Sequence, residues 1–412
     1  MKKLRTIQKN NRLKFKNRKI VLGVTGGIAI YKSASLLREL TIEHGADVQV
    51  IMTDSALKFM STLIFETFSG KPVWTSMFSD REAVGVRHVE ISKWADAVLV
   101  SPATANIIGK AANGIADDLL STVICDAGTK TIFAAAMETG MYENPILKQN
   151  VKRLKDAGFG FIDPEYGSLA SGTNGVGRLA ESRVILHSLL THLNSGSLKG
   201  KKILVSAGPT REWIDPVRFI SNPSTGRMGF SLAEAASAEG ADVTVISGPT
   251  EVANPVGVDL IKVSTAEEMK NAIVENFAKS DALVMSAAVG DYTYPEVSSE
   301  KLKKNGSDLT LILKKTDDIL SALSGDKGDK VIVGFSVETE NVIENSKLKL
   351  NEKSLDLIVV NNPKEKGAAF GHDTNKVSII DRKGTVEELE LMSKSELSTL
   401  IIDRVSNLLN GS

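Results

Sequence analysis

The feature that most constrains this chain is an alternation of short apolar runs with helical patterns, which occurs twice along the sequence. In the first half, apolar runs at 20–24, 48–52 and 97–100 are separated by helical stretches such as 31–40. Short runs of this kind are typical of strands covered on both faces. Their alternation with helices predicts a parallel sheet with right-handed crossovers. The first half is therefore expected to fold as an α/β domain.

The alternation stops at about residue 192 and restarts at Ile203. Residues 194–202, between the two series, are mostly small, polar or charged, as expected of a linker between domains. The second series comprises an expected helix at 228–238 and expected strands at 203–206, 243–246, 282–285, 331–333 and 357–360. We therefore predict an α/β chain of two tandem Rossmann-like domains with mostly parallel sheets, at 20–193 and 203–412.

Composition limits the classes of function. Lys plus Arg is 50 and Asp plus Glu is 50, so the overall charge does not favour nucleic acid or an anionic membrane as a partner. The single cysteine, Cys125, excludes a disulfide framework or a multi-cysteine metal site and is expected to pack as a small apolar residue. No apolar run reaches the roughly 18 residues that span a bilayer. A cytoplasmic enzyme is expected.

Residues 1–19 differ from the rest because they are rich in Lys and Arg and contain no acidic residue. No apolar signal-peptide segment follows, since the next stretch has the pattern of a core strand. A solvated basic tail is the favoured interpretation, and binding to an acidic partner is the alternative.

Three polar loops follow expected strands in the first half, and open α/β sheets bind ligands at the carboxyl ends of strands. The first loop contains Gly26 and Gly27, whose backbone N–H groups could approach a phosphate. It lacks the spacing of a dinucleotide fingerprint, which disfavours an NAD(P)-dependent oxidoreductase. The second, at 101–106, has small, hydroxyl and amide side chains suited to a flat ring or a phosphate. The third contains Ser121 and Thr122, for which helix capping is an equally good interpretation.

Together these motifs resemble the homo-oligomeric flavin-containing cysteine decarboxylases over about residues 20–180. The resemblance rests on Gly-Gly-Ile-Ala at 26–29, His-Val-Glu at 88–90, Pro-Ala-Thr-Ala-Asn at 102–106 and Met-x-x-x-Met at 137–141. It implies a flavodecarboxylase-type fold, bound FMN and a catalytic role for His88. The residues that it places around FMN are Thr25, Gly26, Gly27, Thr53, Thr104, Asn106, Ser121 and Thr122.

Two motifs depart from the pattern of that family. The usual Pro-Ala-Met-Asn is Ala-Ala-Met-Glu here, so the implied substrate contacts are Met137 and Glu138, and a carboxylate replaces an amide donor. The usual Ala-Cys-Gly of a mobile flap is Ala-Ser-Gly, so Ser171 occupies the place of the catalytic acid. A flavin-binding regulatory domain without decarboxylase activity therefore stays open as an alternative.

The most informative stretch of the second half is 206–230, which begins at the end of an expected strand and finishes at the start of an expected helix. Its hydroxyls, glycines and three arginines, Arg211, Arg218 and Arg227, are expected to form an anion cradle. Further on, Asp291 is a candidate contact for Mg²⁺ or a ribose. The lysine-rich run at 300–304 could meet a triphosphate or form a solvated face.

In this order the motifs are similar to those of phosphopantothenate–cysteine ligases over about residues 200–385. The tandem arrangement is similar to the bifunctional decarboxylase and ligase family of coenzyme A biosynthesis. The resemblance implies CTP as co-substrate and Mg²⁺ at Asp291. The nucleotide-binding residues that it implies are Ser286, Ala287, Asp291, Lys301, Asp317, Asp318, Ile319, Leu320, Phe335, Lys349 and Lys353.

The implied reactions join 4′-phosphopantothenate to cysteine through an acyl-cytidylate and then decarboxylate the product to 4′-phosphopantetheine with FMN. By position, Asn222 would contact the acyl-cytidylate and Arg218 would act in its turnover. Lys301 would be catalytic and Arg211 would contact substrate. The resemblance also implies homo-oligomers, with trimers of the flavin half and dimers of the ligase half. The usual Asn-Pro-Asp is Thr-Asp-Asp at 316–318 here.

Overall fold

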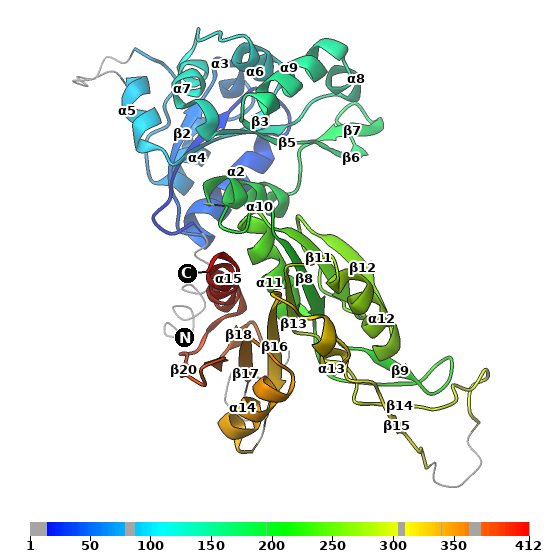
Figure 1. Ribbon diagram of the computed structural model, residues 1–412. Helices are drawn as coiled ribbons and strands as arrows, with labels where there is room; N and C mark the ends of the chain where they lie inside the picture. Colours follow the sequence, from blue (N-terminus) through cyan, green and yellow to red (C-terminus); the bar gives the residue numbers. More distant parts are fainter. Residues whose placement is uncertain are drawn as a thin grey trace, which may run out of the picture. The chain divides into compact units, whose positions relative to one another are not determined.

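The computed structural model describes residues 15–78, 87–194, 196–303, 310–338, 340–361 and 372–411. The chain divides into two compact units, Met1–Asn194 and Ser195–Ser412. Each unit is built around its own β-sheet, and helices pack against that sheet (Figure 1). Among the described residues, no helix combines the length and the apolarity required to cross a membrane.

The first unit contains a five-stranded sheet in the order β2-β1-β3-β4-β5, and all neighbouring strands are parallel. The strands are β1 (Lys19–Val24), β2 (Asp47–Met52), β3 (Ala97–Ala103), β4 (Thr131–Ala135) and β5 (Gly160–Ile162). The predicted bounds of β1 and β2 are correct to within one residue. The prediction ended β3 at Val100, whereas the strand continues through a register shift to Ala103, which pairs with Ala135 of β4.

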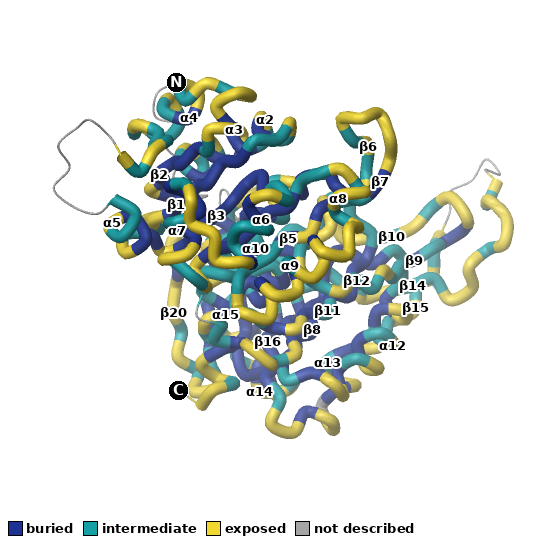
Figure 2. The backbone as a smooth tube through the Cα atoms, turned by 90° about the horizontal axis from the view of Figure 1, so that it is seen from above, coloured by how far each residue is buried: buried dark blue, intermediate teal, exposed yellow. Residues whose placement is uncertain are grey.

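Successive residues of these strands face opposite sides of the sheet and supply two apolar cores. Leu22 and Leu99 belong to one buried cluster, and Val21 and Val98 belong to the other. The central strands are accordingly buried along their length (Figure 2). The helices are α2 (Ile30–Arg38), which continues as a π-helical turn (Glu39–Glu43), α3 (Asp54–Leu57), α4 (Thr62–Ser69), α5 (Arg87–Trp94), α6 (Ala105–Ala112), α7 (Leu119–Ala127), which leads into a 3₁₀ turn (Gly128–Lys130), α8 (Thr139–Tyr142), α9 (Pro145–Asp156) and α10 (Ser182–Leu193).

Two expectations for the first unit need correction. Phe15 is fully buried in the first core, and its backbone N–H donates to the carbonyl of His44 at 3.1 Å. The folded part thus begins before the predicted boundary at residue 20, and residues 1–14 of the predicted tail lie outside the described residues. Cys125 is exposed on α7, so the prediction that it packs as an apolar residue is wrong.

The second unit contains an eight-stranded sheet in the order β12-β11-β8-β13-β16-β17-β19-β20. Pairing is parallel from β12 to β17 and antiparallel between β17, β19 and β20. The prediction of a mostly parallel sheet is confirmed, although the antiparallel edge was not predicted. The strands are β8 (Lys202–Ala207), β11 (Asp242–Ser247), β12 (Asp259–Lys262), β13 (Ala282–Met285), β16 (Val331–Val337), β17 (Leu357–Asn361), β19 (Val377–Asp381) and β20 (Val386–Glu388).

Helices cover this sheet on both faces. Val205 packs in the cluster that includes Phe230, and Leu204 packs in the cluster that includes Ile273. Leu198 is also fully buried in the second unit, so the predicted linker ends earlier than residue 202. The helices are α11 (Arg227–Ala238), α12 (Ala266–Phe277), α13 (Ile319–Ala322), a 3₁₀ turn (Ser324–Asp326), α14 (Val342–Glu352) and α15 (Lys394–Asn410).

Short antiparallel pairs complete both units. In the first unit, β6 (Glu165–Ser168) and β7 (Asn174–Arg178) form a hairpin. In the second, β9 (Arg211–Trp213) pairs with β10 (Phe219–Ser221), and β18 (Thr374–Asn375) pairs with β21 (Met392–Ser393). A further pair, β14 (Tyr292–Thr293) and β15 (Lys314–Lys315), belongs to a segment that extends from the sheet (Figure 1). We call its described residues, 291–303 and 310–316, the arm.

Candidate functional site

The carboxyl ends of β1, β2 and β3 open into a cavity of about 1130 Å³. Of the residues predicted around the cofactor, all but Ser121 and Thr122 line this cavity, namely Thr25, Gly26, Gly27, Thr53, Thr104 and Asn106. They follow three different strands, and they meet because parallel strands present their carboxyl ends at one edge of the sheet.

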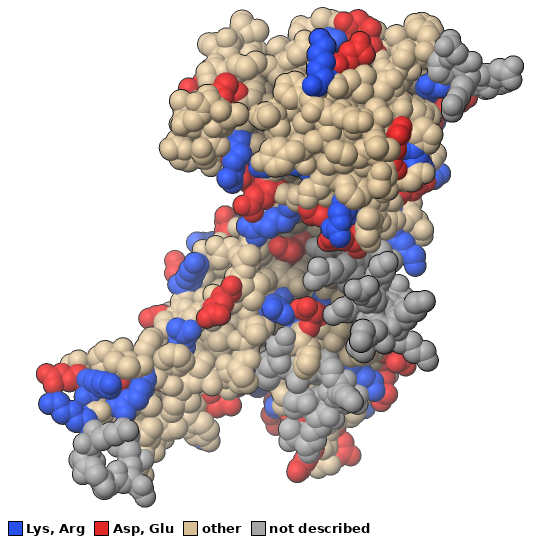
Figure 3. Space-filling model, turned by 180° about the vertical axis from the view of Figure 1, so that it is seen from behind, with Lys and Arg blue, Asp and Glu red and all other residues tan. Residues whose placement is uncertain are grey.

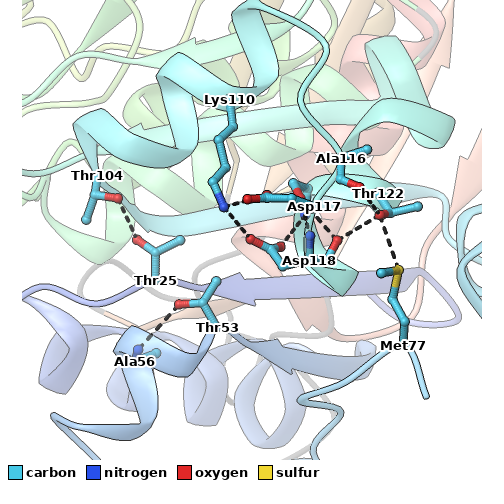
Figure 4. Close-up of polar contacts among 11 residues, drawn as sticks. Thr25, Thr53, Ala56, Met77, Thr104, Lys110, Ala116, Asp117, Asp118 and Thr122 are labelled. Carbon is cyan, nitrogen blue, oxygen red and sulfur yellow. Dashed lines mark hydrogen bonds and ion pairs between the residues drawn. The ribbon is translucent and has the colours of Figure 1, made fainter.

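Hydroxyl groups fix the walls of the cavity. Thr25 is buried, and its Oγ1 donates to the carbonyl of Pro102 at 2.6 Å and contacts Thr104 Oγ1 at 3.4 Å. Thr53 Oγ1 accepts from the backbone N–H of Ala56 at 3.3 Å and so begins α3 (Figure 4). The bonds of Thr25 join the ends of β1 and β3, and the backbone N–H of Thr53 donates to the carbonyl of Val24 at 3.1 Å, which joins β2 to β1.

The helices that begin near the cavity differ in how their N-termini are capped. Neither α2, which follows Ala29, nor α6, which follows Thr104, has a side chain bonded to its first N–H groups. In α7, by contrast, Asp118 Oδ1 accepts from the N–H of Ser121 at 2.8 Å and Ser121 Oγ accepts from the N–H of Asp118 at 3.0 Å. The starts of α2 and α6 are therefore available to an anionic group, whereas α7 is capped internally.

The helix-capping interpretation thus describes what Ser121 and Thr122 do in this structure. Thr122 is not among the described residues that line the cavity, and its Oγ1 donates to the carbonyl of Asp118 at 2.7 Å (Figure 4). Lys110 lies close by, with its ammonium group 2.6 Å from Asp117 and 2.8 Å from Asp118. Burial opposes the charge on Lys110, but its hydrogen bonds to the two carboxylates raise its pKa. The positive charge of Lys110 is therefore already balanced by the two carboxylates.

The β6–β7 hairpin packs closely against the segment that follows β4. A side chain at Gly177 would place its Cβ 2.0 Å from the carbonyl oxygen of Met137, so only glycine fits there. The N–H of Met137 donates to the carbonyl of Gly177 at 3.0 Å, and Arg178 is paired with Glu165 at 2.9 Å. Met137 and Glu138 both line the cavity.

Ser171 lies in the turn of this hairpin and meets Glu138. Ser171 Oγ donates to Glu138 Oε2 at 3.2 Å and lies 2.9 Å from Thr173 Oγ1. Glu138 forms no ion pair with any described residue. The structure therefore brings together one departing residue from each of the two motifs that differ from the expected family pattern.

His88 does not join this group within one copy of the chain. It is half-buried in the first turn of α5 and is not among the described residues that line the cavity.

In the second unit, the polar segment after β8 is bonded to the loop after β13. Ser286 Oγ donates to the carbonyl of Ser206 at 2.9 Å, and the N–H of Ala287 donates to Ser206 Oγ at 3.1 Å. The N–H of Gly290 donates to Thr210 Oγ1 at 2.9 Å. The carboxyl ends of two adjacent parallel strands are thus joined, at the edge of the sheet where ligands bind.

Asn222 belongs to the same arrangement. Its Nδ2 donates to the carbonyls of Ala288 at 3.2 Å and Val289 at 3.0 Å. Asn222, Ser286 and Ala287 are therefore brought together, and Asp291 follows, exposed, at the start of the arm.

A buried carboxylate fixes the arm. Asp215 is fully buried and accepts hydrogen bonds from the guanidinium of Arg218 at 2.9 Å and from the N–H of Leu302 at 3.1 Å. Arg218 also donates to the carbonyl of Leu302 at 2.9 Å. The Arg218 guanidinium holds the pKa of Asp215 well below its usual range. Sequence reasoning assigned no role to Asp215, although its spacing of three residues from Arg218 was the available signal.

The three arginines expected to share an anion are engaged separately. Arg211 lies over the ring of Phe219 at 4.6 Å, Arg218 is paired with Asp215, and Arg227 is paired with Asp373 at 2.6 Å. The described contacts therefore do not form the single arginine cradle that the sequence predicted.

Four of the remaining predicted nucleotide contacts are charged residues that already have partners. Lys353 pairs with Asp318 at 2.7 Å, Lys349 with Glu338 at 2.5 Å, and Asp317 with Lys270 at 2.5 Å. Asp318 also begins α13, so Ile319 and Leu320 form its first turn, and Phe335 is half-buried on β16.

Lys301, Lys314 and Lys315 are exposed residues of the arm. Basic side chains are grouped in this part of the second unit (Figure 3). No group of three or more His, Cys, Asp or Glu that could hold a metal occurs among the described residues.

The chain resembles known proteins over both units. Residues 8–194 match the family described as Flavoprotein, and residues 198–409 match the family described as DNA/pantothenate metabolism flavoprotein C-terminal domain. The coenzyme A biosynthesis bifunctional protein CoaBC of Bacillus subtilis is 43% identical over 396 residues, which cover 95% of this chain and 97% of that protein.

A cysteine/cysteine sulfinic acid decarboxylase of an unknown prokaryotic organism is 39% identical over 358 residues, covering 85% of this chain and 100% of that protein. The crystal structure of the C-terminal domain of a coenzyme A biosynthesis bifunctional protein CoaBC matches with a TM-score of 0.46 and 36% identity, covering 53% of this chain and 100% of that one.

Proposed function

This chain belongs to the family of coenzyme A biosynthesis bifunctional proteins, and we infer that its two units catalyse consecutive reactions. The protein is a phosphopantothenate–cysteine ligase and a phosphopantothenoylcysteine decarboxylase. The observation that carries this assignment is the 43% identity to a bifunctional relative over 95% of the chain, through both units. The flavoprotein match falls on the unit with the cavity, and the other match falls on the unit with the arm.

The first unit is a flavoprotein unit, and we propose that FMN occupies its cavity. A Cβ on Gly27 would have only Thr104 Cγ2 within 4 Å, at 3.6 Å, so the absence of a side chain leaves room for a ligand at the start of α2. The uncapped N-termini of α2 and α6 would hold the phosphate, and Thr25, Thr53 and Asn106 would supply polar contacts. Ser121 and Thr122 would support the site through the cap of α7. Bound FMN supplies reversible hydride exchange with the carbon that carries the thiol.

We also propose that the first unit works as a homo-oligomer, a trimer by resemblance, and the second as a dimer. What supports this is the place of His88, because a catalytic role for a residue off the cavity wall requires the cavity of a neighbouring copy. Mixing chains with His88→Asn and chains with a blocked cavity should restore part of the decarboxylation that each lacks. No recovery under conditions where subunits exchange would contradict a shared site.

For the second unit we propose CTP as the co-substrate. The carboxylate of 4′-phosphopantothenate attacks the α-phosphorus of CTP and releases pyrophosphate. The amine of cysteine then attacks the acyl-cytidylate and releases CMP. A carboxylate is a poor acyl donor until it carries a good leaving group, which is why a nucleotide is needed. We propose that the enzyme acts in the cytoplasm, where CTP is available.

The exposed ammonium of Lys301 would neutralise charge on the triphosphate during the first step. Asp215 and Arg218 would act as positioning residues, because they hold both backbone groups of the neighbouring Leu302. Asn222, beside the loop that contains Ser286 and Ala287, would contact the acyl-cytidylate.

The other predicted residues would take supporting places in the ligase site. Lys349 and Lys353 would exchange their carboxylate partners for phosphate oxygens, and Arg211 would contact the substrate. Mg²⁺ would be shared between the phosphates and Asp291, because magnesium commonly binds through one carboxylate and substrate oxygens.

The assignment is tested with the purified full chain, 4′-phosphopantothenate, cysteine, CTP and Mg²⁺. We expect pyrophosphate and CO₂ in equal amounts. Pyrophosphate without CO₂ would support a ligase joined to a regulatory flavin domain, the alternative that Glu138 and Ser171 keep open. Release of CO₂ from cysteine alone, without CTP, would contradict the assigned substrate and indicate the activity for which one relative is named.

A further inference from the structure

The cavity must contain a group that supplies a proton, if the proposed decarboxylation takes place there. The bond to CO₂ breaks, and its electron pair stays on the carbon that carried the carboxylate. A proton must then reach this carbon, because the carboxylate leaves as neutral CO₂ and the overall reaction consumes one proton. The question is which side chain on the cavity wall can deliver it.

The basic groups on the wall are poorly suited to this task. Lys110 is held by Asp117 and Asp118. Burial lowers the pKa of Lys32, but its ammonium group donates to the carbonyl of Leu179 at 3.1 Å and is held there by the backbone. Arg178 is paired with Glu165, and a guanidinium does not lose its proton in proteins.

Two wall carboxylates without a cation partner among the described residues are Asp54 and Glu138. Asp54 lies in the first turn of α3, and no hydrogen bond from a described residue positions its carboxyl group. The side chain of Glu138 caps no N–H group of α8 and instead accepts a hydrogen bond from Ser171. Glu138 is therefore the better candidate for an acid.

We propose that Glu138, positioned by Ser171, is the acid of the decarboxylation. The carboxyl group of Glu138 is protonated when it binds the substrate carboxylate. It then passes this proton to the carbon that loses CO₂. This inference rests on the proposed function of the first unit. It explains how a carboxyl side chain can stand where substrate recognition calls for a hydrogen-bond donor.

The physical basis is the repulsion between two carboxylates. Two such groups held within hydrogen-bond distance cannot both stay ionised, so they retain one proton between them. A protonated carboxyl donates one hydrogen bond, which a substrate carboxylate accepts much as it would accept one from an amide. Binding of the substrate thus loads the acid at the place where it is needed.

The step balances in atoms and charge. The O–H bond of Glu138 breaks, and a C–H bond forms with the electron pair left by the departing CO₂. Glu138 is then a carboxylate and regains its proton when the next substrate binds. No oxidant or reductant enters this step.

Ser171 acts through Glu138 and is a positioning residue. An aliphatic hydroxyl is a poor proton donor at neutral pH. Its hydrogen bond to Oε2 at 3.2 Å leaves Oε1 for the substrate, and Thr173, at 2.9 Å, can donate to Ser171 in turn. Loss of the Ser171 hydroxyl should therefore weaken the alignment of the acid and leave the acid itself in place.

Proton uptake on binding tests the proposal independently of turnover. The probe is 4′-phosphopantothenoyl-serine, whose hydroxyl replaces the thiol that the reaction requires. Calorimetric titration of the flavin-loaded full chain at about pH 8, in two buffers of different ionisation enthalpy, should show uptake of about one proton per molecule bound. Glu138→Gln should bind the probe with no uptake, and Ser171→Ala should keep it. Uptake unchanged in Glu138→Gln, or absent in the unaltered protein, would overturn the proposal.

Turnover provides the second measurement. Glu138→Gln should release CO₂ about 10² to 10⁴ times more slowly, the usual contribution of a positioned acid. In the unaltered protein kcat/KM should fall about tenfold per pH unit above neutrality, because one proton is taken up, and this slope should be lost in Glu138→Gln. Ser171→Ala should lower kcat about tenfold and keep the slope.

The flavin spectrum and CTP-dependent pyrophosphate release show whether each variant is folded. If Glu138→Gln releases CO₂ at the rate of the unaltered protein, this inference alone fails. If the unaltered protein neither binds the probe nor releases CO₂, the proposed decarboxylase function fails and the inference fails with it.

Discussion

Ser171 donates a hydrogen bond to Glu138 over 3.2 Å, although the two residues are 33 positions apart in the sequence. These residues belong to the two motifs at which the first unit departs from the pattern of the flavin-containing cysteine decarboxylases. The structure shows that the two departures are in direct contact and form one interaction at the rim of the cavity. A change at one position should therefore be felt at the other.

The first prediction concerns this coupling. Glu138→Asn alone should lower CO₂ release about 10²-fold or more, because it removes the acid while Ser171 cannot replace it. Glu138→Asn combined with Ser171→Cys should recover to within about tenfold of the unaltered protein, because a thiol then supplies the proton. The measurement is a double-mutant cycle on kcat for decarboxylation. Equal losses in the single and the double variant would contradict the coupling.

The second prediction concerns the flavin cavity. Gly27→Leu should reduce the ratio of bound flavin to protein about tenfold or more, because the added side chain occupies the space at the start of α2. Gly325→Leu is the matched control, since nothing lies within 4 Å of its added Cβ and it belongs to the other unit. Absorbance of the purified proteins at the flavin bands gives the ratio. Full flavin content in Gly27→Leu would show that the flavin does not bind here.

The third prediction concerns the arm of the second unit. Lys301→Gln should lower CTP-dependent pyrophosphate release by about 10² to 10³, because the ammonium would stabilise charge as the phosphate transfers. Lys303→Gln, exposed two residues away on the same arm, should stay within about twofold. A pyrophosphate assay at saturating cysteine compares the two. Similar losses in both variants would mean that the arm contributes general charge and that Lys301 has no special role.

The fourth prediction concerns the stability of the second unit. The pKa of Asp215 lies below its unfolded value, which is about 3.9, so its ionised form stabilises the folded state above about pH 4. That contribution is lost as the pH falls through the folded pKa. Asp215→Asn should therefore lower the unfolding midpoint by several degrees at neutral pH, and the difference should shrink below about pH 4.

The control for this prediction is Asp329→Asn, at an exposed turn of the same unit, which should leave the midpoint unchanged. Thermal unfolding of the three proteins between about pH 3 and pH 8 provides the comparison. A difference between Asp215→Asn and the unaltered protein that grows on acidification would have the wrong sign and would contradict the assignment.

Local pattern was sufficient for much of the fold. The strand at Ala282–Met285 has the predicted bounds because it is a short run of fully buried residues. The loops that contain Thr25 and Thr104 were predicted to lie at one edge of the sheet because both follow parallel strands, whereas Thr53 was implied only by the resemblance to the flavin-containing cysteine decarboxylases. The antiparallel edge formed by β19 and β20 was not predicted, because no local signal distinguishes such strands from parallel ones.

Contacts between residues far apart in the sequence limited what could be predicted about the two candidate sites. The sequence did not predict that Arg227 pairs with Asp373, which lies 146 positions away. The bond from Leu302 to Asp215 spans 87 positions and gives that buried aspartate its place near Lys301. For Ser121, the sequence allowed both capping and cofactor binding; the bonds to Asp118 show the capping, and cofactor binding stays a prediction. Such choices depend on which groups meet in space.

The most direct test of the account is the molar ratio of CO₂ to pyrophosphate when the full, flavin-loaded chain converts 4′-phosphopantothenate, cysteine and CTP. The account predicts a ratio of about one, with 4′-phosphopantetheine as the final product, because each acyl-cytidylate consumed yields one molecule for decarboxylation. Accumulation of phosphopantothenoylcysteine with a ratio near zero would show that the first unit is not a working decarboxylase, and would contradict the account.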